Sequence, residues 1–286
     1  MAARVRTLPA AVAPVLVGTA LSATERDLRV GGFVAALLGA IFIQVGTNLS
    51  NDYSDARRGA DTEDRLGPVR VTAGGLMPPR TVLIGTYVAF GIAVLAGIYL
   101  IVLAGWQLLV VGAASILAGV LYTGGPKPYG YEGLGEVFVF LFFGVVAVVG
   151  SYFVQTEELI WEAFALSVPV GLLAAAILLV NNIRDADTDR RAGKRTLAVR
   201  LGRGGARNLF VGCIAIAYLV VPFVAVFGRD ISPLVLLALL TIPLALPLIR
   251  TVRERTDGPS LNQALAKTGM LLAVFSVLLS IGLLAS

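Results

Sequence analysis

The stretch QVGTNLSNDYSD, residues 44–55, ends an apolar run that begins at residue 31. Its polar side chains recur every three or four residues, which places them on one face of an α-helix: Gln44, Asn48, Asn51, Asp52 and Asp55. This spacing predicts a hydrophobic helix whose last turns carry a polar and acidic stripe, which we name the first stripe.

A second stripe ends another apolar run far downstream. Asn181, Asp185 and Asp189 are spaced four residues apart, whereas Asp187 points about 160° away from their mean direction and is expected to face elsewhere. Both stripes fall at C-terminal helix ends, where the helix dipole disfavours each carboxylate by about 0.3–1 kcal/mol. Acids gathered at such places need a compensating cation, so we interpret the two stripes as two faces of one active site.

The composition places the chain in a membrane. Of its 286 residues, 57% are hydrophobic and 14% are charged, whereas soluble domains have about 25% charged residues. The chain has no histidine, which removes imidazole as a base and argues against zinc, copper and haem sites. A metal would then be a hard cation held by oxygen, which indicates Mg²⁺. The single cysteine, Cys213, excludes a disulfide within the chain.

Apolar runs predict an all-α membrane domain with nine transmembrane spans, each close to the roughly 20 residues that cross hydrocarbon. The spans cover residues 8–23, 31–50, 81–103, 106–123, 134–153, 161–181, 208–227, 231–249 and 264–284. The first run could instead be a cleaved signal peptide, but Pro9 and Pro14 interrupt it, so we expect a retained helix. The motif Asn-x-x-x-Asp begins at both Asn51 and Asn181, four spans apart, which suggests an internal duplication of spans 2–5 and 6–9.

The charge distribution sets the expected orientation. With the N-terminus in the cytoplasm, all but three of the 23 Lys and Arg residues lie on the inner side, the exceptions being Arg26, Arg29 and Arg229. This arrangement satisfies the positive-inside rule. Both stripes are therefore expected at the cytoplasmic face of a bacterial-type cell membrane.

Two cytoplasmic loops carry further candidate residues. Residues 52–80 are too polar to span, and they mix Arg70 and other arginines with aspartates and glycines, which favours a functional loop over a solvated linker. The fourth span ends near Tyr122 and Lys127. Lys127 is the only basic residue in its loop, while tyrosines are common at membrane edges for other reasons.

These residue types could bind a diphosphate and stabilise it as a leaving group. Mg²⁺ binds one or two carboxylates and completes its coordination with water or phosphate oxygens. Arg70, Lys127 and the cluster Arg190–Arg195 could bind the same phosphate, and the hydrophobic helices would hold an apolar chain and exclude water from a carbocation. A salt-bridge collar, at about 0–1 kcal/mol per surface pair, would not require two matched stripes. A cation or proton transporter would place charges near the bilayer midplane, where these spans have none.

The motifs resemble those of the UbiA superfamily of intramembrane prenyltransferases over nearly the whole chain. The resemblance rests on residues 51–55, and on 185–189 with the following Gly-Lys-Arg-Thr at 193–196. The opening at residues 6–18, together with 48–53 and 193–202, is most similar to the branch that prenylates 1,4-dihydroxy-2-naphthoate in the menaquinone pathway. One departure is that Gly59 stands where the common first motif ends in aspartate, and Asp61 could take its role.

The resemblance implies nine helices around a central cavity and Mg²⁺-dependent transfer of a polyprenyl group from polyprenyl diphosphate to an aromatic acid, with loss of carbon dioxide. The implied ligands of magnesium diphosphate are Asn51, Asp52, Asp55, Asp61, Asp185 and Asp189. The expected catalytic residues are Asp52, Asp55, Asp185, Asp189, Lys127 and Tyr122. The expected substrate-binding residues are Arg6, Asn48, Asn51, Arg70, Lys194 and Arg195.

Two alternatives remain open for the function. Arg6, Thr7, Asn48 and Lys127 would anchor 4-hydroxybenzoate as well as the naphthoate, so the residues themselves indicate only an aromatic acid. A non-catalytic quinone or cation carrier is the minor alternative. The expected partners are the two substrates and the lipid bilayer, with no nucleic acid.

Overall fold

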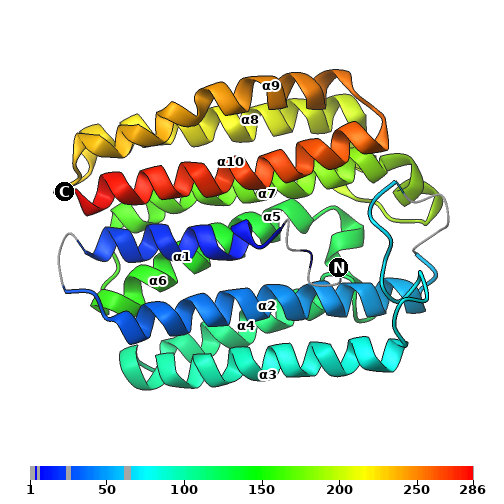
Figure 1. Cartoon of the computed structure of the whole chain (residues 1–286), viewed down its shortest axis with the longest axis horizontal. Helices are drawn as coiled ribbons and strands as arrows, with labels where there is room; N and C mark the ends of the chain where they lie inside the picture. Colours follow the sequence, from blue (N-terminus) through cyan, green and yellow to red (C-terminus); the bar gives the residue numbers. More distant parts are fainter. Residues whose placement is uncertain (1–3, 5–6, 24–26, 61–65, 286) are drawn as a thin grey trace.

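The structure is a computed structural model that describes residues 4, 7–23, 27–60 and 66–285. Within these residues all regular secondary structure is helical, and there is no strand (Figure 1). The helices in chain order are α1 (Pro9–Ser22), α2 (Val30–Arg57), α3 (Pro79–Ala104), α4 (Gln107–Leu121), η2 (Tyr129–Glu132), α5 (Gly135–Val139), η3 (Phe140–Val146), α6 (Ala147–Thr156), α7 (Trp161–Arg191), α8 (Leu197–Phe227), η4 (Pro233–Thr241), α9 (Ile242–Glu254) and α10 (Gly258–Leu284).

The nine predicted spans correspond to nine apolar helical segments. Seven segments in the described ranges are long and apolar enough to cross a membrane, counting α5–η3–α6 and η4–α9 as one each, and α1 and α4 are shorter apolar helices. The prediction of an all-α protein of the multi-pass membrane class is therefore confirmed. Both stripes are helical, because α2 continues to Arg57 and α7 to Arg191. Glycines with positive φ follow these two ends, Gly59 at 64° and Gly193 at 74°, and stop the helices there.

Two spans differ in detail from the prediction. Helix α8, the seventh span, begins eleven residues earlier than expected, at Leu197, and kinks at Gly202, whose φ of 71° is not helical. The fifth span contains the π-helix η3. Gly144 in η3 lies so close to Gly171 of α7 that an added Cβ would come within 2.7 Å of the Gly171 Cα. This close crossing lets the wide π turn pack against α7 and directs Phe142 and Phe143 toward the cavity.

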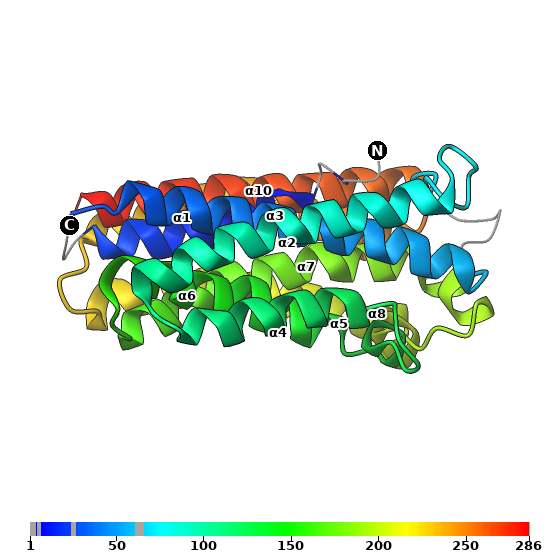
Figure 2. The same ribbon diagram turned by 90° about the horizontal axis from the view of Figure 1, so that it is seen from below.

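The helices form two unequal parts on either side of α1. A continuous apolar core joins α1, α6, α7, α8, α9 and α10, while α3 and α4 contribute only a small cluster around Ala104, Leu108 and Val154. Figure 1 shows α1 between α10 with α7 on one side and α2 on the other, and Figure 2 shows α3 and α4 as the outer wall beyond α2. The thin wall of α2, α3 and α4 leaves space for a cavity against α1 and η3.

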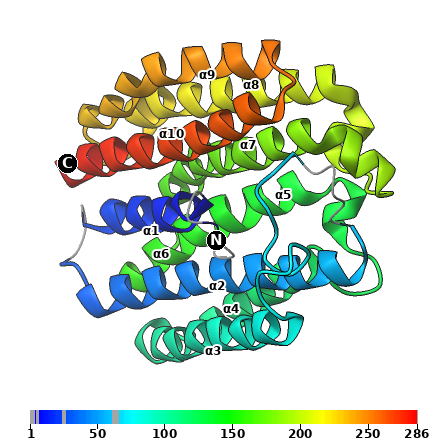
Figure 3. The same cartoon turned by 45° about the vertical axis from the view of Figure 1, so that its right-hand side comes forward.

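The C-terminal ends of α2 and α7 lie at the same end of the bundle. Figure 3 brings this end forward and shows residues 66–78 passing in front of it, from the side of α10 to the start of α3. The loops that follow α4, α7 and α9 are at this end as well. Residues from segments far apart in sequence therefore meet where the two stripes end.

Candidate active site

A cavity of about 460 Å³ runs from the two stripes into the bundle. Its inner part is apolar and is formed mainly by α2, α3, α4 and η3. The polar side chains at its outer end come from both stripes and the nearby loops: Asn48, Asn51, Asp55, Arg70, Asn181, Asn182, Asp185, Asp189, Lys194 and Thr196. The predicted meeting of the stripes at one cavity is thus present in the structure.

Asp55 is the most closely surrounded acid of the first stripe. It is buried, and its Oδ2 accepts a hydrogen bond from Arg70 Nη2 at 3.1 Å. Its Oδ1 accepts a bond from the Tyr131 hydroxyl at 2.6 Å and lies 3.6 Å from Lys194 Nζ. Lys194 Nζ also lies 4.7 Å from the centre of the Tyr131 ring. Two cations and a hydroxyl therefore compensate one buried carboxylate, as burial of a charge requires.

Asp52 faces a different environment from Asp55. Its Oδ2 accepts the backbone N–H of Val71 at 3.0 Å, and its Oδ1 accepts that of Thr72 at 2.8 Å. Asp52 does not line the cavity. Its carboxylate instead anchors the loop that carries Arg70, which sequence spacing alone does not distinguish from a metal-binding position.

The second stripe is held mainly by its own helix. Asp185 receives two hydrogen bonds from Arg184, Nε to Oδ1 at 2.8 Å and Nη2 to Oδ2 at 2.6 Å. Asp189 lines the cavity, and its Oδ2 lies 3.5 Å from the Thr196 hydroxyl. Asp187 is exposed and pairs with Arg203 at 2.9 Å. The prediction that Asp187 faces away from the stripe is confirmed.

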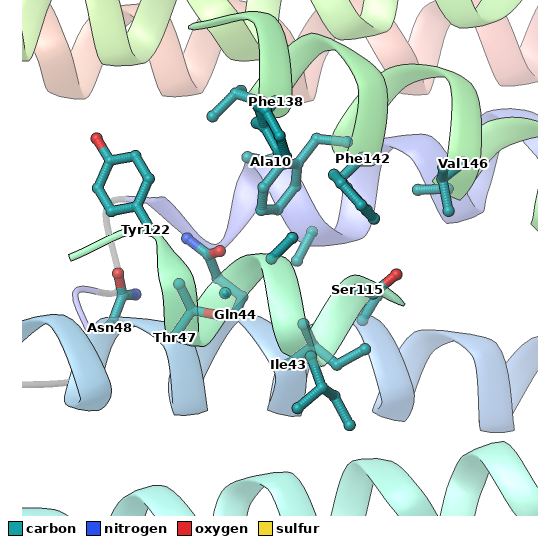
Figure 4. Close-up of a pocket in the computed structure, with 18 of the residues that line it drawn as sticks. Ala10, Ile43, Gln44, Thr47, Asn48, Ser115, Tyr122, Phe138, Phe142 and Val146 are labelled. Atoms are coloured by element: carbon teal, nitrogen blue, oxygen red, sulfur yellow. The ribbon is translucent and has the colours of Figure 1, made fainter. Parts of the chain in front are cut away.

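Amide side chains form one side of the cavity. Thr7 Oγ1 accepts hydrogen bonds from Gln44 Nε2 at 3.1 Å and from Asn48 Nδ2 at 3.4 Å, and it donates to the Arg4 carbonyl at 2.9 Å. Figure 4 shows Asn48 and Gln44 projecting into the cavity from α2. Because amides both donate and accept, this side can bind hydroxyl and carboxylate groups of a ligand.

Aromatic rings form the opposite side, as Figure 4 shows for Tyr122, Phe138 and Phe142. Ring centres lie 5.4 Å apart for Tyr122 and Tyr129, 4.0 Å for Tyr129 and Phe138, and 6.1 Å for Phe138 and Phe142. Burial raises the pKa of the Tyr129 hydroxyl above its usual range, so it stays protonated and donates to the Ala118 carbonyl at 2.9 Å. This continuous aromatic wall presents ring faces and edges to anything in the cavity.

Several predicted site residues do not reach the cavity. Lys127 is exposed in the turn after α4, and Arg195 is exposed, with its backbone N–H donating to the Tyr131 carbonyl at 2.8 Å. Both were predicted from charge and loop position, which do not determine the direction of a long side chain. Arg6 and Asp61 lie outside the described residues.

Three site residues were missed by the sequence analysis. Tyr131 contacts Asp55, Arg184 contacts Asp185, and Glu136 accepts a bond from Asn182 Nδ2 at 2.8 Å. Arg184 had a sequence signal, since it is the one basic residue inside the second stripe. Tyr131 and Glu136 had none beyond their proximity to Lys127.

The donor atoms fit a hard cation bound together with a ligand. Among the described residues, no three acidic, cysteine or histidine side chains gather closely enough to hold a metal by themselves. The cavity end nevertheless supplies carboxylate oxygens from Asp55, Asp185 and Asp189 and an amide from Asn51. Oxygen donors of this kind suit Mg²⁺ whose remaining positions are filled by phosphate or water.

The chain is similar to known proteins over nearly its whole length. Residues 11–274 match the UbiA prenyltransferase family. The 1,4-dihydroxy-2-naphthoate octaprenyltransferase of Mycobacterium tuberculosis is 42% identical, with 96% of this chain and 92% of that protein covered. The enzyme of the same name from Bacillus subtilis is 35% identical, with coverage of 99% and 91%. The structure of a UbiA homologue from Archaeoglobus fulgidus bound to DMAPP and Mg²⁺ matches at a TM-score of 0.67 and 17% identity, with 98% of each chain covered.

Proposed function

The chain belongs to the UbiA prenyltransferase family, and from this premise we propose that it transfers a polyprenyl group from polyprenyl diphosphate to 1,4-dihydroxy-2-naphthoate. The observation that carries the proposal is a cavity with acids and cations from both stripes at one end and an apolar interior. Relatives that are 35–42% identical over nearly the full chain are named for this reaction. The immediate product would be a prenylated 1,4-dihydroxynaphthalene, the quinol form of a menaquinone precursor.

The diphosphate would bind at the outer end of the cavity. Arg70 and Lys194 now compensate Asp55, and both are cations suited to phosphate oxygens. On binding, they would turn from Asp55 to the diphosphate and leave the Asp55 carboxylate available. Asp55, Asp185, Asp189 and Asn51 are the oxygen donors that would hold the ion. Bound Mg²⁺ would neutralise charge on the departing diphosphate, and a homologue of this family is known bound to DMAPP and Mg²⁺.

Asp52 and Asp61 have separate places in this proposal. Asp52 would act through the loop, because both of its oxygens accept backbone N–H groups there. Asp61 is retained as a candidate ligand from the sequence motif.

The apolar part of the cavity would hold the prenyl chain. The chain would lie along α3 and α4, with its allylic carbon near Tyr122 and the diphosphate at the stripes. The faces of aromatic rings such as Tyr122 attract positive charge, and an apolar cavity excludes water that would capture an allylic cation. Both effects favour breaking the bond between the allylic carbon and the diphosphate oxygen.

The acceptor ring would bind between the amide side and the aromatic wall. Gln44, Asn48 and Thr7 supply hydrogen-bonding groups for its hydroxyls and carboxylate. An electron-rich ring carbon attacks the allylic carbon, and the carboxylate leaves as carbon dioxide, so its bonding electrons restore the conjugated ring. The same groups would bind 4-hydroxybenzoate, which is the alternative acceptor.

The orientation proposed from the sequence places the active site at the cytoplasmic face of the cell membrane. All but three of the Lys and Arg residues lie on that side in the predicted topology. Cysteines introduced at Arg58 and Arg191 in a Cys213→Ala background should react with impermeant reagents only from the cytoplasm. Labelling of either from outside intact cells would contradict this orientation.

The function is tested by incubating membranes that contain the protein with radiolabelled polyprenyl diphosphate and a panel of aromatic acceptors. We expect label in the product of 1,4-dihydroxy-2-naphthoate, with carbon dioxide released in equal amount. Faster labelling of 4-hydroxybenzoate than of the naphthoate at equal concentration would show that 4-hydroxybenzoate is the preferred acceptor. No transfer to any aromatic acid would overturn the proposal.

A further inference from the structure

Arg184 links the second stripe to a helix that the proposed chemistry does not use. Its side chain is buried, 2% exposed, and Nη2 donates to Asn181 Oδ1 at 2.8 Å in addition to its two bonds to Asp185. Its Nη1 donates to Asn262 Oδ1 on α10 at 2.6 Å. A guanidinium is planar and its donors have fixed directions. The position of Asn262 therefore restricts the position of Arg184, and through it that of Asp185.

Asn262 has a second contact, on the loop between α2 and α3. Arginine only donates hydrogen bonds, so the atom that faces Arg184 must be the amide oxygen. The Nδ2 group then faces the other way and donates to the Leu66 carbonyl at 3.0 Å. Gly258, one turn earlier on α10, lies against the same residue, since an added Cβ would come within 3.2 Å of Leu66 Cβ.

The loop segment 66–72 is consequently held at both ends. Leu66 is fixed to α10 by Asn262, while the N–H groups of Val71 and Thr72 are fixed to α2 by Asp52. Arg70 lies between the two anchors and reaches Asp55 at 3.1 Å. Figure 3 shows the described segment running from the side of α10 back toward α2.

We propose that Asn262 is a positioning residue that sets the spacing between the two sides of the diphosphate site. Through Leu66 it fixes the loop that carries Arg70, and through Arg184 it fixes Asp185. The inference rests on the proposed function, because the spacing matters only if one diphosphate contacts both sides. Leu265 is the residue of α10 that lines the cavity in the described part of the chain, and Asn262 does not line it, so Asn262 acts through its two neighbours.

The substitution Asn262→Asp separates the two contacts of this residue. One carboxylate oxygen still accepts from Arg184, while the other replaces the donor and faces the Leu66 carbonyl, so the loop anchor is lost. The matched control is Gln263→Glu, the same amide-to-acid change at the neighbouring, exposed position of α10. Any effect of added negative charge on α10 should appear in both variants.

Two readouts are measured on the full-length protein in detergent. Loss of one hydrogen bond should raise hydrogen–deuterium exchange of segment 66–72 about tenfold in Asn262→Asp. The KM for polyprenyl diphosphate should rise by about the same factor, with kcat within about twofold and the KM for the acceptor unchanged. Gln263→Glu should change neither quantity. A merely structural role would instead raise exchange along α10 and leave the KM for the diphosphate unchanged, which would overturn the proposal.

A tether provides the rescue. The Cβ positions of residues 66 and 258 are close to the separation of a disulfide. In a Cys213→Ala background, Leu66→Cys with Gly258→Cys should restore the KM of Asn262→Asp when oxidised and lose the rescue on reduction. No rescue in a protein shown to be cross-linked would overturn the proposal. The exchange result does not depend on the acceptor, so failure of the naphthoate assignment would appear separately, as absent turnover by the unmodified protein.

Discussion

The two stripes share the spacing Asn-x-x-x-Asp but differ in what holds their acids. Asp55 in the first stripe is compensated by groups from three other segments: Arg70, Tyr131 and Lys194. Asp185 in the second stripe is paired with its neighbour Arg184 on the same helix. A carboxylate held by separate segments can exchange its partners for a ligand, whereas one paired within a buried network keeps a fixed geometry. The first stripe therefore supplies exchangeable charge and the second a rigid opposing side.

The largest effect is expected from Asp55→Asn. This change leaves Arg70 and Lys194 beside a neutral amide and removes a charged contact to the magnesium diphosphate. Turnover with polyprenyl diphosphate should fall at least about a hundredfold, because one such contact contributes about 2.7–4 kcal/mol in the transition state. Asp187→Asn is the matched control, since Asp187 is exposed on α7 and pairs with Arg203. Equal activity of the two variants would show that Asp55 does not contact the magnesium diphosphate.

Asp185→Asn should also lower turnover about a hundredfold, but it differs from Asp55→Asn in its effect on stability. It removes one of the two carboxylate oxygens that accept hydrogen bonds from the buried Arg184, together with the negative charge, which should lower the free energy of unfolding by about 1–3 kcal/mol. Thermal unfolding in detergent measures this difference. If Asp55→Asn destabilises the protein more than Asp185→Asn, the distinction between an exchangeable and a rigid side is wrong.

Asp52→Asn tests whether two acids of one stripe have different tasks. The amide keeps one oxygen, which can accept the N–H group of either Val71 or Thr72. Its NH2 group then faces the other N–H group, so that hydrogen bond is lost. The loop should loosen, and the KM for polyprenyl diphosphate should rise about tenfold with a smaller change in kcat. A hundredfold fall in kcat at unchanged KM would show that Asp52 is a ligand of the reacting group.

The smallest effect is expected at Lys127 and Arg195. Both side chains are exposed and do not line the cavity. Lys127→Ala and Arg195→Ala should each leave kcat/KM within about twofold of the unmodified enzyme. A loss of tenfold or more in kcat/KM, measured in steady-state assays, would support the roles that the sequence predicts for these residues. It would mean that Lys127 or Arg195 also binds substrate, on the side of the site where Tyr131 and Lys194 lie.

Local pattern predicted the helices and the stripes because both depend on residues close in sequence. Apolar runs predicted the nine apolar helical segments, seven of which are long enough to cross a membrane in the described residues, and helical spacing correctly separated Asp187 from Asp185 and Asp189. The group that a side chain hydrogen-bonds depends on the paths of loops distant in sequence. The sequence therefore did not reveal that the Asp52 carboxylate accepts the backbone N–H groups of Val71 and Thr72. The π-helix η3 packs closely against α7, and a contact between distant segments has no local sequence signal. The internal duplication stays a prediction.

The central claim is that the two stripes together bind one magnesium diphosphate, and metal dependence of the purified enzyme tests it most directly. The protein is treated with EDTA, and transfer of radiolabelled prenyl groups to 1,4-dihydroxy-2-naphthoate is followed as Mg²⁺ is returned. We expect activity to disappear with EDTA and to return with Mg²⁺ in the unmodified enzyme, with Asp55→Asn remaining at least a hundredfold lower throughout. Full activity in the EDTA-treated enzyme would contradict the claim.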